Sequence, residues 1–483
     1  MKQKLKKGCM LLLYAAMFFF VSCIDGYKDE TSWSSSVQNA QLESPSAESI
    51  KIIKGDEKMT VSWPVVYGAG GYQFSCYIVD DPDNPVVVGE ENEVVDDCSV
   101  ERALAEDTKY KIVIKTLGNP KYNNKDALTT TEVAWDNMLT IYAKIPAGTN
   151  LTDYFTANPV PQDSINTELG YELEAGGDYT MNGNVSTGKV QVTIKGDKVA
   201  HPAITMTDGS FVCGNGFTLK FIDIDYSNFA GANTNSIILM DPVFPTEGLT
   251  QSGYAVIPSG VPIAIKSCKI TGLKYYLFYD SDKYYALSSF LIKDCIIGQN
   301  TNEFSQALIR FSKGMVKDWT VTDCTFYNEK APSHSSNRLC QISTGNIGSV
   351  KPLNELWANG SMTVTNCTFW QAGKTAQSFN SNGAFGGAAD KVTVSKCVFV
   401  DSYENGRIIS RFRRGTTSAT FTGGDNSQWY GGQLFTGSQD VTADVGYLTS
   451  DPQLTYLGNG EFKMEGAEQI SKRTGDPRWL PAQ

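Results

Sequence analysis

The chain has 483 residues, and its 41% hydrophobic and 19% charged content is that of a globular protein rather than of a disordered one. Its 52 acidic residues outnumber its 41 basic ones, which gives a formal net charge of −11 at pH 7. This excess argues against nucleic acid as a partner, because neutralising phosphates needs a net basic surface. The 44 glycines and the short Val-, Thr- and Ile-rich runs between turn residues favour an all-β protein.

The pattern of the first 22 residues predicts an export signal. Four lysines among the first seven residues precede Met10–Val21, an apolar stretch shorter than a membrane-spanning helix needs. Removing this signal takes away four lysines and no acids, so the net charge falls from −11 to −15 and the mature protein is more acidic still.

The stretch FFFVSC (18–23) resembles a bacterial lipobox, in which the cysteine becomes the lipid-modified first residue of the mature protein. That residue is Cys23 here, although Phe20 stands where the motif usually has leucine. Three acidic residues close behind it resemble the surface-export signal of Bacteroidetes lipoproteins: Asp25, Asp29 and Glu30. The resemblance implies a protein that is lipid-anchored in the cell outer membrane and exposed at the surface. The alternative is a plain secretory signal or an uncleaved anchor.

Two segments precede the repetitive part of the chain. Residues 23–49 are polar and rich in serine, which predicts a flexible tether. Residues 50–145 have the strand spacing of a β-sandwich, with apolar runs at MTVSWPVV, GYQFSCYIV and TKYKIVIKTL. The run LAEDTKY, with Leu104 six residues before Tyr110, resembles the tyrosine corner of fibronectin type III domains, and Trp63 stands where their core tryptophan would lie. The resemblance implies a spacer or binding platform without an active site.

One nine-residue pattern occurs five times between residues 262 and 400, as PIAIKSCKI, FLIKDCIIG, WTVTDCTFY, MTVTNCTFW and VTVSKCVFV. Its cysteines are Cys268, Cys295, Cys324, Cys367 and Cys397. The positions five and three before each cysteine and two after it are apolar in every copy. A strand, a corner and a second strand repeated in this way predict a solenoid whose turns bury matched side chains in columns. We therefore expect residues 146–483 to form a parallel β-helix.

The cysteines of this region lie in an inward column, which predicts small buried side chains rather than disulfides or metal ligands. No spacing indicates a zinc site, and the chain has only two histidines, His201 and His334. A catalytic triad that needs histidine is therefore not expected.

A polar residue precedes each cysteine of the repeat: Ser267, Asp294, Asp323, Asn366 and Lys396. Short polar side chains that bond to neighbouring backbone suit a tight corner. Calcium binding by Asp294 and Asp323 is the alternative.

Beyond residue 145 the chain resembles Bacteroidetes proteins with a right-handed β-helix of the pectin lyase type, the DUF4957 and DUF5123 type. The residues that carry this resemblance are LEAGGDYTMNGNVSTGKVQVTIKGD (173–197), the cysteine turns, and SDPQLTYLGNGEFKMEGAEQISKRTGDPRWL (450–480). The resemblance implies the fold, but this fold carries lyases, hydrolases and non-catalytic binding proteins, so it does not name the function.

A second recurring pattern places basic side chains on the solenoid, in LIRFSKG (308–314), LCQISTG (339–345) and ISRFRRG (409–415). Stacking these segments puts Arg310, Gln341 and Arg411 in one column. Further columns hold Ser312, Ser343 and Arg413, and Lys313, Thr344 and Arg414. Arginine forks match carboxylates, so a repeated basic stripe on an acidic protein predicts an acidic, pectin-like polysaccharide as the ligand. The alternative is that these arginines pair with nearby acids on an ordinary solvated face.

These observations favour a surface lipoprotein that binds an acidic polysaccharide without catalysis, in a glycan-uptake system that includes an outer-membrane transporter. For the ligand-binding site we expect Arg310, Lys313, Gln341, Arg411, Arg413 and Arg414, and no cofactor. The alternative is a polysaccharide lyase acting on uronates by β-elimination, with Arg310 or Arg411 as the base and Ca²⁺ to neutralise the uronate. A structural adhesin is a third possibility.

Overall fold

The computed structural model divides into two compact units, one ending at Leu139 and one comprising Thr140–Gln483. The described residues are 38–55, 57–243, 250–251, 253–302, 304–330, 337–343, 357, 359–373, 378–381, 384–385, 387–403, 419–435 and 446–482. The predicted signal and lipidation residue Cys23 therefore lie outside them. No helix among the described residues is long and apolar enough to cross a membrane.

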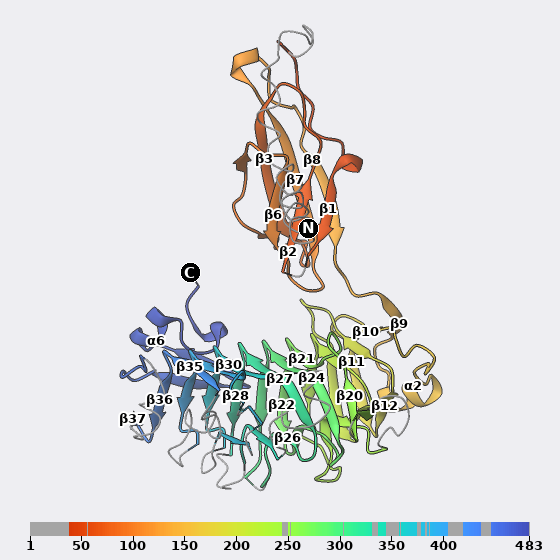
Figure 1. Cartoon of the computed structure of the whole chain (residues 1–483), viewed down its shortest axis with the longest axis vertical. Coiled ribbons are helices and arrows are strands. Elements are labelled where there is room, and N and C mark those ends of the chain that lie inside the picture. Colours follow the sequence, from red (N-terminus) through yellow and green to blue (C-terminus); the bar gives the residue numbers. More distant parts are fainter. Residues whose placement is uncertain are drawn as a thin grey trace, which may run out of the picture. The chain divides into compact units, whose positions relative to one another are not determined.

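The first unit consists of two antiparallel sheets (Figure 1). The smaller contains β1 (Lys51–Lys54), β2 (Lys58–Ser62) and β6 (Ser99–Ala103). The larger contains β4 (Val86–Val87), β3 (Ala69–Ile78), β7 (Lys109–Gly118) and β8 (Thr131–Asp136), with β5 (Glu93–Val95) also paired to β3. Two 3-10 turns, η2 (Ala47–Ser49) and η3 (Pro120–Tyr122), complete it.

Buried side chains from both sheets form one core in this unit. Trp63 stacks on Phe74 with ring centroids 5.8 Å apart, and meets Tyr72 edge-on at 5.3 Å. The hydroxyl of Tyr110 accepts a hydrogen bond from the backbone N–H of Ala105 at 2.6 Å, just after Leu104. The fibronectin type III assignment of this unit stays a prediction.

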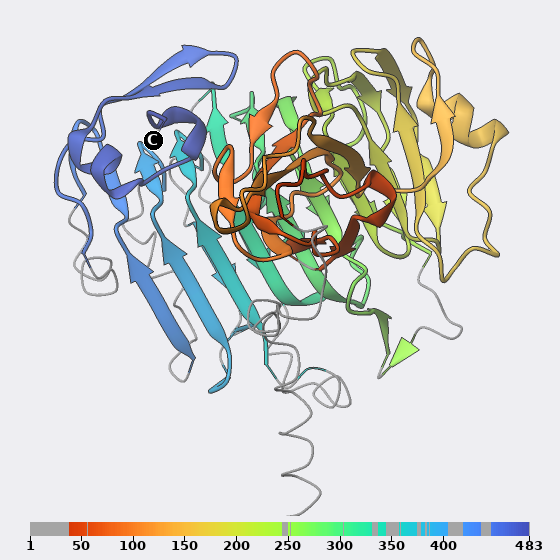
Figure 2. The ribbon, with the colours of Figure 1, turned by 90° about the horizontal axis from the view of Figure 1, so that it is seen from above.

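The second unit is a parallel β-helix, so the predicted all-β fold class is confirmed (Figures 1 and 2). Its 12-stranded sheet runs β35 (Thr420–Gly424), β33 (Lys391–Ser395), β30 (Ser361–Thr365), β27 (Met315–Thr322), β24 (Tyr285–Lys293), β21 (Ile263–Lys266), β16 (Phe217–Lys220), β13 (Val192–Lys195), β10 (Leu169–Leu173) and β9 (Ile141–Ile145), and includes β19 (Thr250–Gln251) and β20 (Tyr254–Ile257). Because β9 pairs in parallel with β10, the unit begins before the expected residue 146.

Two further sheets complete each turn. The 10-stranded sheet runs β11 (Asp178–Asn182), β14 (Ala203–Asp208), β17 (Asp223–Asp225), β22 (Lys269–Leu273), β25 (Ile296–Gln299), β28 (Thr325–Asn328), β31 (Thr368–Trp370), β34 (Val398–Val400), β36 (Ser427–Tyr430) and β37 (Gln433–Leu434). The 7-stranded sheet runs β12 (Val185–Gly188), β15 (Phe211–Cys213), β18 (Ser236–Met240), β23 (Tyr276–Tyr279), β26 (Ile309–Phe311), β29 (Cys340–Ile342) and β32 (Phe379–Ser381). Helix α2 (Leu151–Ala157) packs beside β11 and β12.

The predicted columns are present in the strand registers. Trp319 lies beside Phe290 and Met362 in neighbouring strands, and Phe326 lies beside Phe369, with their rings stacked at 5.2 Å. All nine described cysteines are free thiols, and the five of the repeat are buried in the core. Burial raises the pKa of the Cys324 thiol, as it does for its neighbours Cys295 and Cys367.

The polar residue before each cysteine forms the corner between the 12-stranded and 10-stranded sheets. All five residues have positive φ, between 47° and 55°, so the chain turns through the left-handed region that short polar side chains tolerate better than most. Ser267 donates a hydrogen bond to Asp294, and Asn366 donates one to Asp323, which links successive turns. The corner interpretation is confirmed.

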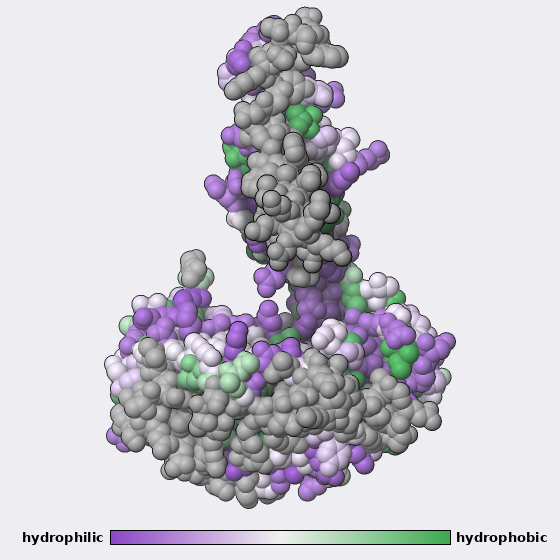
Figure 3. Space-filling model, viewed as in Figure 1, coloured by the Kyte–Doolittle hydropathy of each residue, from purple (hydrophilic) through white to green (hydrophobic). Residues whose placement is uncertain are grey.

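The C-terminal strap, which we define as residues 450–482, lies against the outer face of the 10-stranded sheet in its last turns (Figure 2). It contains the hairpin of β38 (Leu454–Gly458) and β39 (Glu461–Met464), followed by α6 (Ala467–Lys472) and η5 (Pro477–Trp479). Met464 and Leu480 of the strap pack on Val398 and Val400. Hydrophilic residues occupy much of the described surface around it in the view of Figure 3.

Candidate functional site

The structure describes only part of the predicted basic stripe. Arg310 on β26 and Gln341 on β29 are register partners, as the predicted column requires. Lys313 follows in the turn after β26. Arg411, Arg413 and Arg414 lie outside the described residues, as does Thr344.

The guanidinium of Arg310 is already bonded within the protein. Its Nη1 donates to the hydroxyl of Tyr276 at 3.0 Å and to Oε1 of Gln306 at 2.5 Å. It also lies over the rings of Tyr276 and Tyr279, 6.0 and 5.7 Å from their centroids. Arg310 therefore contributes to the packing of β23 against β26, and its predicted role in ligand binding stays a prediction.

Asp280, directly after β23, is a fully buried carboxylate beside this cluster. Its Oδ2 accepts backbone N–H groups of Lys313 at 2.8 Å and of Gly314 at 2.6 Å. Burial raises the pKa of Asp280 to about 6, although these backbone donors act in the opposite direction. Asp280 thus joins the turn after β23 to the turn after β26.

The raised pKa of Asp280 predicts a specific pH dependence of stability. Because the folded-state pKa lies above the unfolded one, the stabilising contribution of Asp280 is complete below the unfolded pKa and is lost as the pH rises through about 6. Relative to Asp280→Asn, the wild-type protein should be more stable at pH 5 than at pH 7 by on the order of 1 kcal/mol in urea unfolding. An identical stability difference at both pH values would contradict this account.

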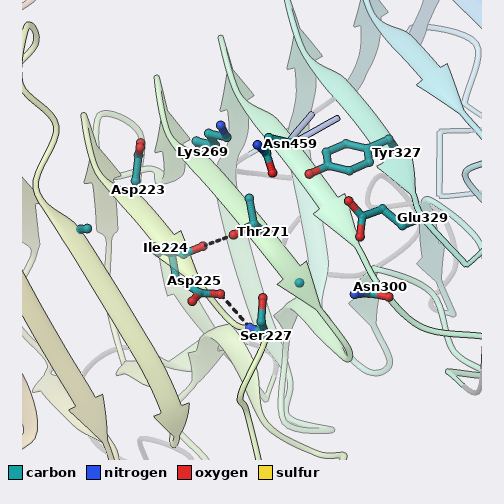
Figure 4. A pocket seen from close by; sticks show the side chains of 12 residues that line it. Asp223, Ile224, Asp225, Ser227, Lys269, Thr271, Asn300, Tyr327, Glu329 and Asn459 are labelled. Atoms are coloured by element: carbon teal, nitrogen blue, oxygen red, sulfur yellow. Dashed lines mark hydrogen bonds between the residues drawn. The ribbon is translucent and has the colours of Figure 1, made fainter. Parts of the chain in front are cut away.

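A groove of about 470 Å³ lies on the outer face of the 10-stranded sheet (Figure 4). Its lining residues are Ala203, Asp223, Ile224, Asp225, Ser227, Lys269, Thr271, Gly272, Asn300, Tyr327, Glu329 and Asn459. Strands β14, β17 and β22 form one part, and the end of β28 and the tip of the strap hairpin form the other. The register places Asp223 beside Lys269 and Asp225 beside Thr271, so these side chains project from the same rigid face.

The groove carries three carboxylates and one ammonium group. Asp223 lies 2.9 Å from Nδ1 of His201, and Asp225 accepts the backbone N–H of Ser227 at 2.9 Å. Glu329, on the opposite side in Figure 4, accepts a hydrogen bond from Tyr456 of the strap at 2.7 Å. Each contact fixes one oxygen of a carboxylate, which retains further acceptor sites for a ligand.

Glycine permits the close packing that borders the groove. At Gly298, which is the register partner of Tyr327, an added Cβ would lie 2.2 Å from Cζ of the tyrosine. The ring of Tyr327 therefore lies over a residue without a side chain, next to the groove.

Sequence reasoning missed this groove. The segment FIDIDY alternates apolar inward and acidic outward residues, and this period-2 pattern of aspartates was the available signal. No local pattern identifies Glu329 and Asn459 as their neighbours, because the strap brings Asn459 back from far along the sequence.

The described residues offer no cluster of three His, Cys, Asp or Glu side chains that could hold a metal ion. At the corners, where calcium was the alternative, Asp294 Oδ1 accepts from Arg478 and Oδ2 from Ser267. Asp323 likewise accepts hydrogen bonds from Thr322 and Asn366, so both carboxylates serve the corners as acceptors for the protein itself.

Three family models match the chain. Residues 3–176 match DUF4992, residues 177–329 match DUF4957 and residues 362–479 match DUF5123. All three are described as domains of unknown function. No curated protein matches the chain.

Two solved structures are similar to the chain at 11% sequence identity. One is pectate lyase PelI of Erwinia chrysanthemi in complex with tetragalacturonic acid, with a TM-score of 0.14. The other is pectate lyase Pel3 of Pectobacterium carotovorum, with a TM-score of 0.13. Each match covers 82% of this chain and 92% of the other.

Proposed function

We propose that this protein binds a polysaccharide without cleaving it, and that the groove on the 10-stranded sheet holds the sugar chain. The observation that carries the proposal is the groove lining. Carboxylate and hydroxyl side chains on β17 and β22 meet the amides of Asn300 and Asn459 and the carboxylate of Glu329, which lie just beyond strand ends, at one concave surface. Sugars present many hydroxyl groups, and such a surface offers both donors and acceptors at fixed positions.

The charge of the groove favours an uncharged chain over the acidic one that the sequence predicts. Asp223, Asp225 and Glu329 face one cation, Lys269, so a uronate would add carboxylates beside carboxylates of the protein. Hydroxyl groups instead donate to these carboxylates, and hydrogen bonds to charged acceptors are the stronger ones. We therefore propose a neutral polysaccharide as the ligand of this groove.

An acidic ligand at the basic stripe and a lyase reaction there both stay predictions. An acidic ligand there requires Arg411, Arg413 and Arg414, which lie outside the described residues. The lyase alternative requires a base such as Arg310, whose guanidinium bonds to Tyr276 and Gln306.

We also propose that Cys23 carries a lipid anchor in the outer membrane, where the protein captures glycan for an uptake system. The support is the sequence of residues 1–30, with its basic start, apolar stretch, cysteine and following acids.

A panel of neutral and acidic polysaccharides tests the proposal. The full chain, purified in detergent, should bind at least one neutral polysaccharide, and Asp225→Asn should weaken this binding about tenfold or more because a charge-assisted hydrogen bond is lost. Asp163→Asn is the matched control, because Asp163 is an exposed carboxylate that does not line the groove. Absence of binding to every neutral polysaccharide, or equal binding by Asp225→Asn, would reject the proposal.

A further inference from the structure

We infer that the groove receives the end of a sugar chain rather than its interior. This inference rests on the proposed function, and it adds a specificity that follows from how the strap meets the groove. Three observations carry it: a change of burial along one column of side chains, the contact of the hairpin tip with the sheet, and the position of Asn459.

The outward column of side chains that passes through the groove becomes buried within a few turns. Asp178 is exposed, and Ala203, Asp223 and Lys269 are half-buried. Their register partners farther along the same sheet are 0% exposed: Thr325, Thr368, Val398 and Ser427. The open face of the sheet thus ends at β25, whose Ile296 lies between Lys269 and Thr325 in the register.

The hairpin of the strap closes the face at this point. A Cβ added at Gly460 would lie 2.7 Å from Cγ2 of Ile296 and 2.9 Å from Cε1 of Tyr327, so the tip touches the sheet directly. Behind the tip, Tyr456 stacks on Trp370 with ring centroids 4.7 Å apart. No sugar chain can pass between the hairpin and the sheet without displacing these contacts.

A sugar chain that enters along the open column is therefore blocked by the strap hairpin. In Figure 4, Asn459 projects between Lys269 and Tyr327, at the strap side of the groove. The terminal sugar would lie against Asn459 and Glu329, while the following sugars extend over β17, β14 and β11 towards solvent. The other end of the face is open, because Asp178 and Thr180 on β11 are exposed.

Limited hydrolysis of the polysaccharide tests this inference. The probes are linear galactan, xylan and mannan, each offered intact and after partial acid hydrolysis at equal mass. The full chain should bind hydrolysed material in greater molar amount, in proportion to the number of chain ends created. Equal binding at equal mass would overturn chain-end recognition while leaving the proposed function intact. Failure to bind every neutral polysaccharide of the panel, intact or hydrolysed, would instead reject the proposed function.

A variant at the tip of the strap hairpin provides a second test. Asn459 has a φ of +52°, so Asn459→Gly removes its amide without adding backbone strain. This variant should weaken binding of the hydrolysed probe about fivefold, through the loss of a neutral hydrogen bond. Leu457→Ala is the control, because Leu457 is an exposed residue of the same hairpin outside the groove lining. Unchanged affinity in Asn459→Gly would overturn the placement of the terminal sugar.

Discussion

Arg478→Ala is expected to detach the C-terminal strap and to lower the free energy of unfolding of the β-helical unit by about 3 to 5 kcal/mol, as is typical when one partner of a buried ion pair is removed. The guanidinium bonds to Asp476, whose side chain is only 1% exposed. It also donates to the backbone carbonyls of Asp294, Cys295 and Asp323 at 2.8–3.0 Å. One side chain thus holds the strap to two successive corners.

The variant leaves the Asp476 carboxylate buried without its cation. Burial already raises the pKa of Asp476 and Arg478 opposes this effect, so the variant should regain part of its stability at lower pH, where Asp476 is protonated. The double variant Asp476→Asn, Arg478→Ala should be more stable at pH 7 than Arg478→Ala alone, because it buries no unpaired charge.

Hydrogen exchange of residues 450–482 and urea unfolding measure both effects. Faster exchange should appear in the strap, and in the sheet strands β28 and β31 that it covers, before it appears elsewhere. Unchanged exchange in the strap of Arg478→Ala would show that apolar packing alone holds it.

The column architecture could be predicted from the sequence because it is local and periodic. Trp319, Met362 and Val392 occur at one position of a repeated pattern, and stacking the turns brings them together. The same reasoning located the corner residues, since a tight turn restricts the residue types that fit it.

The candidate site could not be predicted in the same way because its parts are not periodic. Asp225 lies on a turn of the solenoid, but Asn459 reaches the groove only through the strap hairpin. The strap in turn is held by contacts such as that of Arg478 with Asp294, which are far apart in the sequence. Predicting that Arg310 and Gln341 share a column also does not predict which side chains they bond to. The hydrogen bonds of Arg310 to Tyr276 and Gln306 could therefore not be read from the repeat.

Trp319→Ala should destabilise the β-helical unit by about 3 to 5 kcal/mol, the range for truncating a large buried aromatic side chain. Trp319 is the largest fully buried side chain of the described residues. It stacks on Phe290 with ring centroids 6.4 Å apart and meets Phe379 edge-on at 6.3 Å. Neighbouring turns support each other in a solenoid, so the cavity should weaken β24 and β30 on either side of β27.

Trp319→Phe separates the loss of volume from the loss of the indole N–H. Nε1 of Trp319 has no hydrogen-bond partner among the residues that the structure describes, so phenylalanine removes a buried donor that contributes no bond there. We therefore expect Trp319→Phe to be destabilised much less than Trp319→Ala in urea unfolding, with exchange in β24 and β30 close to that of the wild-type protein. Equal destabilisation by the two substitutions would indicate that the indole N–H makes a bond essential to the core, and would contradict a column held together by packing alone.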